Sequence, residues 1–578
     1  MAISGNKRKP QSSEQQSKKT KNDGAGAAAT NKRQLKQERQ STRRHAEIVV
    51  SAKEIWNKLR QKNNTPEINR KLMDELMPLI RGKANQIALQ HDASRVVQAA
   101  IQFGSKEERQ EIAKELTATP GSLVELSKSQ YAHFCVLKLI KYCHTDEVAT
   151  KLVVKNFRTH FPTLVVHAVA SRIVESMWTM FGDKKIAVLR YELYGPHFGL
   201  FVAGDEATPK SLTQLLEENP AKKEKALEFL LKLLQKGMEK SLYGFHYFQD
   251  LMAEYCDNAS GSDIRKNLCS TASDHAVHLL AGRTGTRAAA LLATYSTPKD
   301  RKALLKSLKG YALSGLLHRD AYLAIIRLVQ LTDDTVTVNK YILQELVTAP
   351  KVEKDDQEEK LHPLMQLSLS DTGSKFLLMQ LTDASERKFL DPYERSIVGD
   401  ENPTIVEVDG KETPTSKKEP SLRRTQVLDH IKESLLQTCV DNAGALLLSR
   451  PGAVVLRHVY TALGQPTSLV ESIIQACKDF DKEKNIFEDP LGHLALKQLI
   501  MEDVDAKKNV FAEAFVSVFE NDLHHIAGTN RGAFVLVALC KVGMKDVISK
   551  KVKTAQLKKS VKTDGPKAGF EALVNELK

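Results

Sequence analysis

The chain has 578 residues, of which 27% are charged and 42% apolar, a balance typical of a folded protein in water. No run approaches the roughly 18 uninterrupted apolar residues of a membrane span, and the first residues lack the apolar core of a secretory signal, so we expect neither a membrane-spanning nor a secreted protein. The formal net charge is +14, and residues 1–44 hold twelve Lys and Arg against three acids. The remaining 534 residues are therefore only mildly basic, and any nucleic-acid surface there must be a local patch.

Residues 1–44 are rich in Lys, Gln, Ser and Ala and have no helical apolar period, which predicts a disordered basic arm. The clusters Lys7-Arg8-Lys9 and Lys18-Lys19-Thr20-Lys21 are typical of nuclear import signals, although a merely solubilising tail has the same composition. The seven cysteines are scattered and form no C-x-x-C pair, so we expect reduced thiols that serve as small core residues.

Residues 45–393 have the pattern of paired short amphipathic helices, opened by a cap that carries Ile55, Trp56 and Leu59 on one face. Breakers separate the helices, among them Pro120-Gly121 and Thr297-Pro298. No alternation strong enough to predict a strand is present. The sequence therefore predicts an all-α N-terminal array.

Two polar stretches interrupt this array. Residues 351–360 are predicted to form a charged, exposed loop. Residues 394–425 contain three prolines and are predicted to be a flexible linker. Helical pairs resume over residues 426–578, which predicts a second repeat array that ends in a Lys-rich stretch over 551–562.

A short phrase returns along the helical part and sets the fold prediction. Ser94-Arg95-Val96-Val97-Gln98 recurs as Ser171-Arg172-Ile173-Val174-Glu175, and looser copies begin at His133 and Thr286. The regular spacings between second positions are 39 from Arg95 to Phe134, 38 from there to Arg172, 41 from His246 to Arg287 and 35 from there to Tyr322. Self-similarity at this period indicates a stacked helical solenoid.

The first copy predicts a helix between an N-cap at Asp92 and a stop at Gly104. Ser94 and Gln98 are four residues apart, so we expect them to lie one above the other with Arg95 beside them. One turn would then offer two polar groups to a base edge and one planar cation that stacks on a base. The opposite face would pack between repeats through Val96, Val97, Ala100 and Ile101.

These phrases resemble the RNA-facing helix of Pumilio (Puf) repeats, in which two side chains contact a base edge and a third stacks between bases. The order of segments over about residues 50–578, including Leu193–Gly195 and Thr297–Lys302, is similar to the Pumilio-like nucleolar family called Penguin or Puf-A. The resemblance implies an α-solenoid of about eleven Pumilio-type repeats in a bent array. It also implies a location in the nucleus and nucleolus, binding of RNA or DNA with little sequence preference, and a role in pre-ribosomal RNA processing and large-subunit assembly.

Carried over by position, the resemblance implies these RNA-binding residues: Ser94, Arg95, Gln98, His133, Phe134, Ser171, Arg172, Glu175, His246, Gln249, Thr286, Arg287 and Tyr322. Basic runs on predicted helices add these phosphate-contact candidates: Lys184, Lys185, Arg190, Lys299, Arg301 and Lys302. The fifth position of several copies is apolar, as at Leu137 and Ile325, and in later repeats Ala453 and Leu494 replace the stacking residue. Many repeats therefore cannot discriminate bases, and we expect stacking and phosphate contacts to dominate.

No catalytic arrangement is identifiable, so we expect no enzyme, no cofactor and no metal site. His524-His525 has no further ligand at metal spacing, and Gly282–Arg287 lacks the ending of a phosphate loop and is predicted to start a repeat helix. The expected partners are pre-ribosomal RNA, DNA as a second ligand, and assembly proteins around a monomer within a larger ribonucleoprotein particle. Two alternatives stay open: a protein-binding nuclear scaffold of the HEAT or armadillo type, and a sequence-specific mRNA translational repressor.

Overall fold

The computed structural model describes residues 46–91, 93–199, 208–349, 361–408, 410–480, 485–561 and 566–578. The predicted arm 1–44, the predicted N-cap Asp92 and the predicted loop 351–360 lie outside these residues. The chain divides into two compact units, residues 1–186 and 187–578. This division falls far from the boundary at 394–425 that the sequence suggested.

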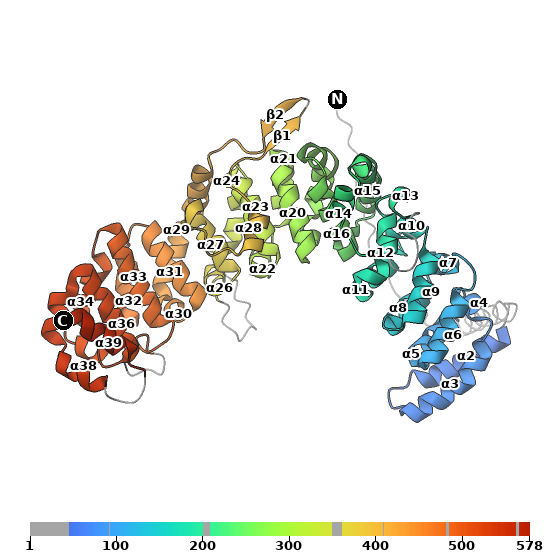
Figure 1. Cartoon of the computed structure of the whole chain (residues 1–578), viewed down its shortest axis with the longest axis horizontal. Coiled ribbons are helices and arrows are strands. Elements are labelled where there is room, and N and C mark those ends of the chain that lie inside the picture. The colour runs from blue at the N-terminus through green and yellow to red at the C-terminus, as the bar shows by residue number, and fades with distance from the viewer. Residues whose placement is uncertain are drawn as a thin grey trace, which may run out of the picture. The chain divides into compact units, whose positions relative to one another are not determined.

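The described residues of the first unit form helices joined by turns, with no strand among them (Figure 1). Its helices are α2 (Ala46–Leu59), α3 (Pro66–Ile80), α4 (Ala84–Ala88), α5 (Ser94–Phe103), α6 (Lys106–Leu116), α7 (Ser122–Lys128), α8 (His133–Cys143), α9 (Glu147–Phe157), α10 (Phe161–Val165), α11 (Ser171–Met180) and the start of α12 (Asp183–Glu192).

The second unit continues with helices, in which η marks a short 3₁₀- or π-helix, and adds one two-stranded hairpin. The part before residue 350 consists of α13 (Pro196–Gly199), α14 (Leu212–Glu218), η1 (Pro220–Lys222), α15 (Lys223–Glu239), η2 (Leu242–Gly244), α16 (His246–Asn258), α17 (Gly261–Ile264), η3 (Arg265–Cys269), α18 (Ser270–Ala272), η4 (Ser273–His275), α19 (Ala276–Leu279), α20 (Arg283–Tyr295), α21 (Pro298–Ser307), α22 (Ala312–Leu317), α23 (Ala321–Leu331), α24 (Thr335–Val338), η5 (Asn339–Leu343) and α25 (Gln344–Val347). The part after residue 360 consists of α26 (Pro363–Leu369), α27 (Gly373–Leu381), η6 (Ala384–Glu386), α28 (Pro392–Val398), β1 (Ile405–Val408), β2 (Lys411–Pro414), α29 (Pro420–Asp441), α30 (Ala443–Leu447), α31 (Arg450–Ala462), α32 (Thr467–Ala476), α33 (Gly492–Ala506), α34 (Val510–Phe519), α35 (Leu523–Ile526), α36 (Asn530–Leu539), η7 (Cys540–Met544), α37 (Lys545–Lys551), α38 (Thr554–Ser560) and α39 (Ala568–Leu577).

The repeating unit is a short helix, a longer helix that carries the recurring phrase, and a companion helix, as in α7, α8 and α9. We call the phrase-bearing helices ladder helices. They pack on one another in chain order, α5 on α8 and α8 on α11 in the first unit, and α16, α20, α23, α27, α31, α33 and α36 in the second, where α39 packs on α36 (Figure 1). This stacking confirms the predicted α-solenoid. Within the described part of the chain, no helix combines the length and apolar character that crossing a bilayer requires.

Local sequence explains where these helices start and stop. Ser105 and Thr297 form capping boxes at the starts of α6 and α21, and α5 ends at Gly104, as predicted. Val96, Val97, Ala100 and Ile101 are fully buried between repeats, which confirms the predicted packing face. All seven cysteines are buried free thiols, as expected of small core residues.

The absence of strands was predicted wrongly. Strands β1 and β2 pair antiparallel, with Ile405 opposite Pro414 and Val408 opposite Lys411. The sequence carries the signal, because Asp409-Gly410 separates Ile405-Val406-Glu407-Val408 from the next run, and Asp-Gly is a favoured two-residue hairpin turn. Val406 is buried, and the Ser262 hydroxyl donates to the Glu407 carbonyl, 2.5 Å away, so α17 holds the hairpin.

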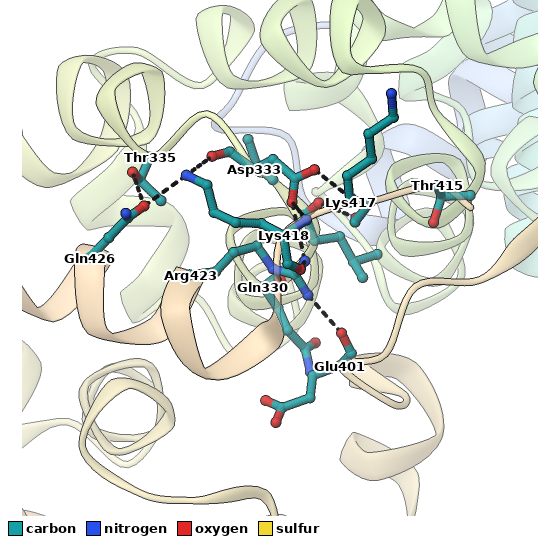
Figure 2. Close-up of polar contacts among 12 residues, drawn as sticks. Gln330, Asp333, Thr335, Glu401, Thr415, Lys417, Lys418, Arg423 and Gln426 are labelled. Atoms are coloured by element: carbon teal, nitrogen blue, oxygen red, sulfur yellow. Dashed lines mark hydrogen bonds and ion pairs between the residues drawn. The ribbon is translucent and has the colours of Figure 1, made fainter. Parts of the chain in front are cut away.

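Residues 394–425 are anchored to the array instead of forming the expected flexible linker. Arg423, on α29, is 1% exposed and donates to the carbonyl oxygens of Gln330 at 2.9 Å and Glu401 at 2.8 Å (Figure 2). Its guanidinium also lies 3.1 Å from the Asp333 carboxylate, which accepts the Lys417 backbone N–H at 2.7 Å. Since α27 packs on both α29 and α31, the ladder continues past the segment.

Candidate nucleic-acid interface

The second position of the phrase is exposed on all three ladder helices of the first unit. Arg95, Phe134 and Arg172 are each the second residue of their helix, and Phe134 is 45% exposed. Because α5, α8 and α11 stack in order, these side chains follow one another on successive rungs. An Arg, an aromatic ring and an Arg can each lie flat on a nucleobase. We call this row the stacking row.

The opening helix α2 adds a ring beside the first rung. The guanidinium carbons of Arg60 and Arg95 lie 5.2 Å and 5.8 Å from the centre of the Trp56 ring. These residues line an open depression of about 390 Å³, which α8 closes with Lys138. The Lys138 ammonium donates to Gln102 Oε1 at 2.8 Å. The depression therefore combines three cations with a half-buried indole, a composition suited to phosphate and base together.

Sequence reasoning missed part of this depression. Trp56 was predicted only as part of the apolar face of the opening cap, and Arg60 and Lys138 were not predicted as site residues. The available signal was the Trp56/Arg60 pair, which lies four residues apart on one helix face ahead of the first phrase.

The first position of the phrase is buried, which corrects the expected base-edge contacts. Ser94 is 3% exposed, His133 3% and Ser171 0%. Each begins its ladder helix directly after the short helix of the same repeat, and its backbone N–H donates to a carbonyl four residues back, as from Ser171 to His167. The turn between the two helices thus covers this side chain. These residues are in position to hold the repeat together and not to contact a base.

His133 shows what this environment does to a titratable group. Its Nδ1 lies 3.0 Å from the Ser129 carbonyl, and its ring centre is 3.9 Å from that of Phe134. Burial lowers the pKa of His133, and the positive charge of Arg172 on the next ladder helix lowers that pKa further. The imidazole is therefore neutral at physiological pH, and it packs against the ring of Phe134.

The fifth position of the phrase is half-buried in the first unit, with Gln98, Leu137 and Glu175 on the three ladder helices. Gln98 Nε2 lies 3.5 Å from the Ser94 hydroxyl, at the limit of a hydrogen bond. One polar group per rung on two rungs, with no accessible first-position partner, cannot give the paired contacts that base recognition requires.

The second unit places its candidate residues differently. His246 is exposed at the start of α16, whereas Gln249 is 1% exposed and donates its amide to the carbonyls of Tyr243 and His278, 2.9 Å and 3.1 Å away. Thr286 is fully buried, and Arg287 lies 2.8 Å from the carboxylate of Asp257 on the neighbouring helix. Gln249 and Thr286 are therefore structural, whereas Arg287 is half-exposed and forms a surface ion pair with Asp257.

Tyr322 was predicted to stack on a base, but it is only 2% exposed. Its hydroxyl donates to the Glu394 carboxylate on α28, 72 residues later. Burial raises the pKa of the Tyr322 phenol well above its ordinary value, and the hydrogen bond to Glu394 raises it further. An aromatic residue fits this repeat position, but Tyr322 is covered by α28, which the sequence around Tyr322 does not indicate.

Of the six phosphate-contact candidates, three are exposed, and the other three, Lys185, Arg190 and Arg301, bond to other parts of the protein. Lys184, Lys299 and Lys302 are exposed, and Lys185 is half-buried with its ammonium 2.8 Å from the His144 carbonyl. Arg190, on α12, lies 2.5 Å from the Glu254 carboxylate on α16 and 3.0 Å from the Tyr194 hydroxyl. It therefore links two helices and is not available to a nucleic-acid phosphate.

Arg301 is the clearest correction among the phosphate candidates. It is 2% exposed and donates to the carbonyls of Ala293, Leu331 and Thr415 at 2.9, 2.7 and 2.7 Å. Burial lowers the pKa of Arg301 to about 10, which leaves it cationic at neutral pH. It ties the ends of two ladder helices to the 394–425 segment.

The remaining motifs behave structurally. Gly282 precedes α20, which begins at Arg283, as predicted for that glycine-rich run. His525, on α35, lies with its ring centre 6.1 Å from that of Phe480. Across the described ranges, His, Cys, Asp and Glu side chains form no group of three or more able to hold a metal ion.

Comparisons with known proteins give the family. Residues 400–511 match the CPL (NUC119) domain, so the match starts inside the segment expected to be a linker. The chain is 30% identical to Pumilio homolog 3 of Rattus norvegicus over 570 residues, which cover 94% of this chain and 82% of that protein. It is also 30% identical to Pumilio homolog 3 of Homo sapiens, with the same coverage of both chains.

A solved structure agrees with this kinship. The crystal structure of human Puf-A superposes with a TM-score of 0.76 at 26% identity, covering 92% of this chain and all of that one. The same values hold for human Puf-A in complex with DNA. The stacked repeats and the kinship over nearly the whole length lead to one conclusion: the chain belongs to the Pumilio-like family of the Puf-A type.

Proposed function

We propose that this protein binds single-stranded RNA with little sequence preference, through the stacking row and the Trp56 depression of its first unit. The observation that carries the proposal is the contrast within each rung. The second position, Arg95, Phe134 or Arg172, is exposed, while the first position is buried. A surface that exposes planar side chains for stacking and buries the polar side chains that could contact base edges binds single-stranded RNA without discriminating its bases.

Magnitudes favour this mode of binding. Stacking is worth roughly 1–3 kcal/mol per base and tolerates any base. Phosphate contacts from cations such as Arg60 and Lys138 add affinity that falls with salt and carries no sequence information. Stacking on Arg95, Phe134 and Arg172, together with phosphate contacts from these cations, therefore binds RNA without any hydrogen bond to a base edge. The solved complex of human Puf-A with DNA supports a nucleic-acid surface on this fold and adds DNA as a second ligand.

We propose further that the RNA is pre-ribosomal, and that the protein works in the nucleolus during large-subunit assembly, without catalysis. The twelve basic residues of the arm 1–44 and the resemblance to the nucleolar Puf-A proteins support this assignment. Crosslinking in cells followed by sequencing of the bound RNA tests it. Reads concentrated in precursor ribosomal RNA are expected, and reads concentrated in mRNA would overturn it.

The sequence-specific repressor is disfavoured because the buried hydroxyls of Ser94 and Ser171 cannot contribute to a base code. A protein scaffold has one supporting observation, in the later repeats. Leu494 stands at the stacking position of α33 and is 45% exposed, where an apolar side chain suits a protein partner better than a base. We therefore assign RNA to the first unit and assign assembly proteins to the later ladder helices.

A double substitution tests the RNA face. Arg95→Ala with Arg172→Ala should weaken binding of a 15-nucleotide single-stranded RNA by about a hundredfold, about 1.4 kcal/mol per lost stack. The matched control is Lys151→Ala with Lys155→Ala, which removes the same charge from exposed positions on the companion helix α9. The control should lose only a fewfold. Equal losses in both variants would show bulk electrostatics and contradict the proposed face.

A further inference from the structure

The ladder helix α23 has no open face. Every residue from Ala321 to Val329 is buried, whereas the equivalent helix α8 exposes Phe134 and Lys141. A helix that is apolar nearly all round requires neighbours on every side. On α23, the side that is open in the first unit is covered by α28, which packs against α23 and α20.

Helix α28 meets the ladder through an acid and an aromatic ring. Glu394 is 6% exposed, and its carboxylate accepts hydrogen bonds from Tyr322 and Lys375, which stand at the stacking position of α23 and α27. Tyr393 places its ring 3.6 Å from the guanidinium carbon of Arg283, one turn before Arg287 on α20. Two successive stacking positions thus meet an anion, and a neighbouring arginine meets a flat ring.

These are the two chemical groups that a nucleotide would bring. A phosphate would accept from Tyr322 and Lys375 as the Glu394 carboxylate does, and a base would lie on the Arg283 guanidinium as the Tyr393 ring does. The helix is also fixed at both ends. Asp391 caps its start by accepting the Glu394 N–H at 2.8 Å, and the Arg327 guanidinium donates to the Asp400 carbonyl just after its end.

We propose that α28 is an internal occupant of the nucleic-acid face on α20, α23 and α27, and that it keeps bound RNA off these three helices. This inference rests on the proposed RNA-binding function of the ladder helices. It assigns residues 391–400 to excluding RNA from these three helices of the second unit. In the second unit, the chain's own helix α28 therefore fills the rungs that α20, α23 and α27 form.

The test compares Tyr393→Ala/Glu394→Ala with the control Ser396→Ala in the full chain. Ser396 is an exposed residue of the same helix, and its hydroxyl donates to the Tyr393 carbonyl within that helix. Photo-crosslinking to oligouridylates of 10 and 30 nucleotides, with peptide mapping, gives the contacts. Fluorescence anisotropy gives the affinities, and thermal unfolding monitored by circular dichroism confirms that each variant folds.

Wild type and Ser396→Ala should crosslink on α5, α8 and α11, with no crosslinks on residues 283–290, 321–327 or 373–378. The double variant should gain crosslinks on those three segments and bind the 30-nucleotide RNA about tenfold tighter, the gain of about one stacked base, with the 10-nucleotide affinity unchanged. Crosslinks on the three segments in wild type would overturn the inference, even if the double variant failed to fold. So would a folded double variant that gains none. Absence of crosslinks on α5, α8 and α11 in the wild-type protein would instead refute the proposed function.

Discussion

Phe134 and Tyr322 occupy the same place in two repeats, each as the second residue of a ladder helix, yet one is 45% exposed and the other 2%. Both are aromatic and both fit a stacking position. The difference comes from α28, which supplies Glu394 to the Tyr322 hydroxyl and has no counterpart over α8 among the described residues. A residue type at a repeat position therefore indicates what a side chain could do, whereas a distant segment decides whether it is accessible.

Arg301→Met should produce the largest effect, on the anchoring of the segment that leads from α28 to α29. It removes the donor to the buried carbonyls of Ala293, Leu331 and Thr415, of which Leu331 keeps the Ser416 hydroxyl, at a cost of about 3 kcal/mol. Amide exchange of residues 404–418 should accelerate by about a hundredfold. Lys302→Met is the matched control, because the adjacent Lys302 is exposed and should leave exchange unchanged. Similar exchange in both variants would refute the anchoring role of Arg301.

Phe134→Ala set beside Tyr322→Ala tests the comparison directly. Loss of the exposed ring should weaken RNA binding by about tenfold, the value of one stacked base, without changing thermal unfolding. Loss of the buried Tyr322 ring should destabilise the second unit by about 3 kcal/mol, the cost of leaving a cavity in a packed core, and leave RNA affinity unchanged. Anisotropy titration and thermal unfolding of the same samples measure both. The comparison fails if Tyr322→Ala costs as much RNA affinity as Phe134→Ala.

Trp56→Ala should have a smaller effect, about fivefold on RNA affinity, because the indole is half-buried and its flanking cations Arg60 and Arg95 remain. Trp56→Phe keeps a ring in the depression and should recover most of the affinity. Quenching of the Trp56 fluorescence by bound RNA, measured in a Trp178→Phe background because Trp178 is the second tryptophan of the chain, provides a second readout. An alanine variant indistinguishable from wild type would remove the depression from the interface.

Ser94→Ala with Ser171→Ala should have the smallest effect, less than about twofold on RNA affinity, because both hydroxyls are buried. Affinities for homopolymer RNAs of different base, measured side by side, should keep their order in the variant. A reordered preference would mean that these hydroxyls reach the bases after all.

The fold was accessible from the sequence, because the phrase repeats at the period of a solenoid and breakers such as Thr297-Pro298 punctuate it. The candidate site was accessible in part. Arg95, Phe134 and Arg172 are exposed as expected, whereas Ser94 and Ser171 are covered by the preceding turn. A helical wheel places the first position beside the second and gives no account of the short helix before it.

Long-range contacts explain the rest. Arg301 and Lys302 are neighbours in one basic run, yet only Arg301 faces the carbonyls of Leu331 and Thr415, 30 and 114 residues away. Thr415 belongs to a segment whose prolines and charges resemble a linker. Asp409-Gly410 indicates the hairpin in this segment. No local pattern indicates that Arg301 and Arg423 bind the segment to the ladder helices through Thr415 and Glu401.

The most direct test of the account is equilibrium selection from a random pool of single-stranded RNA, with sequencing of the bound fraction, for wild type and for Arg95→Ala/Phe134→Ala/Arg172→Ala. Wild type should retain RNA without enriching a motif, and the triple variant should lose nearly all of that RNA while its helical content is unchanged. A defined motif enriched by wild type, or full retention of RNA by the triple variant, would contradict a stacking row that holds RNA without recognising its sequence.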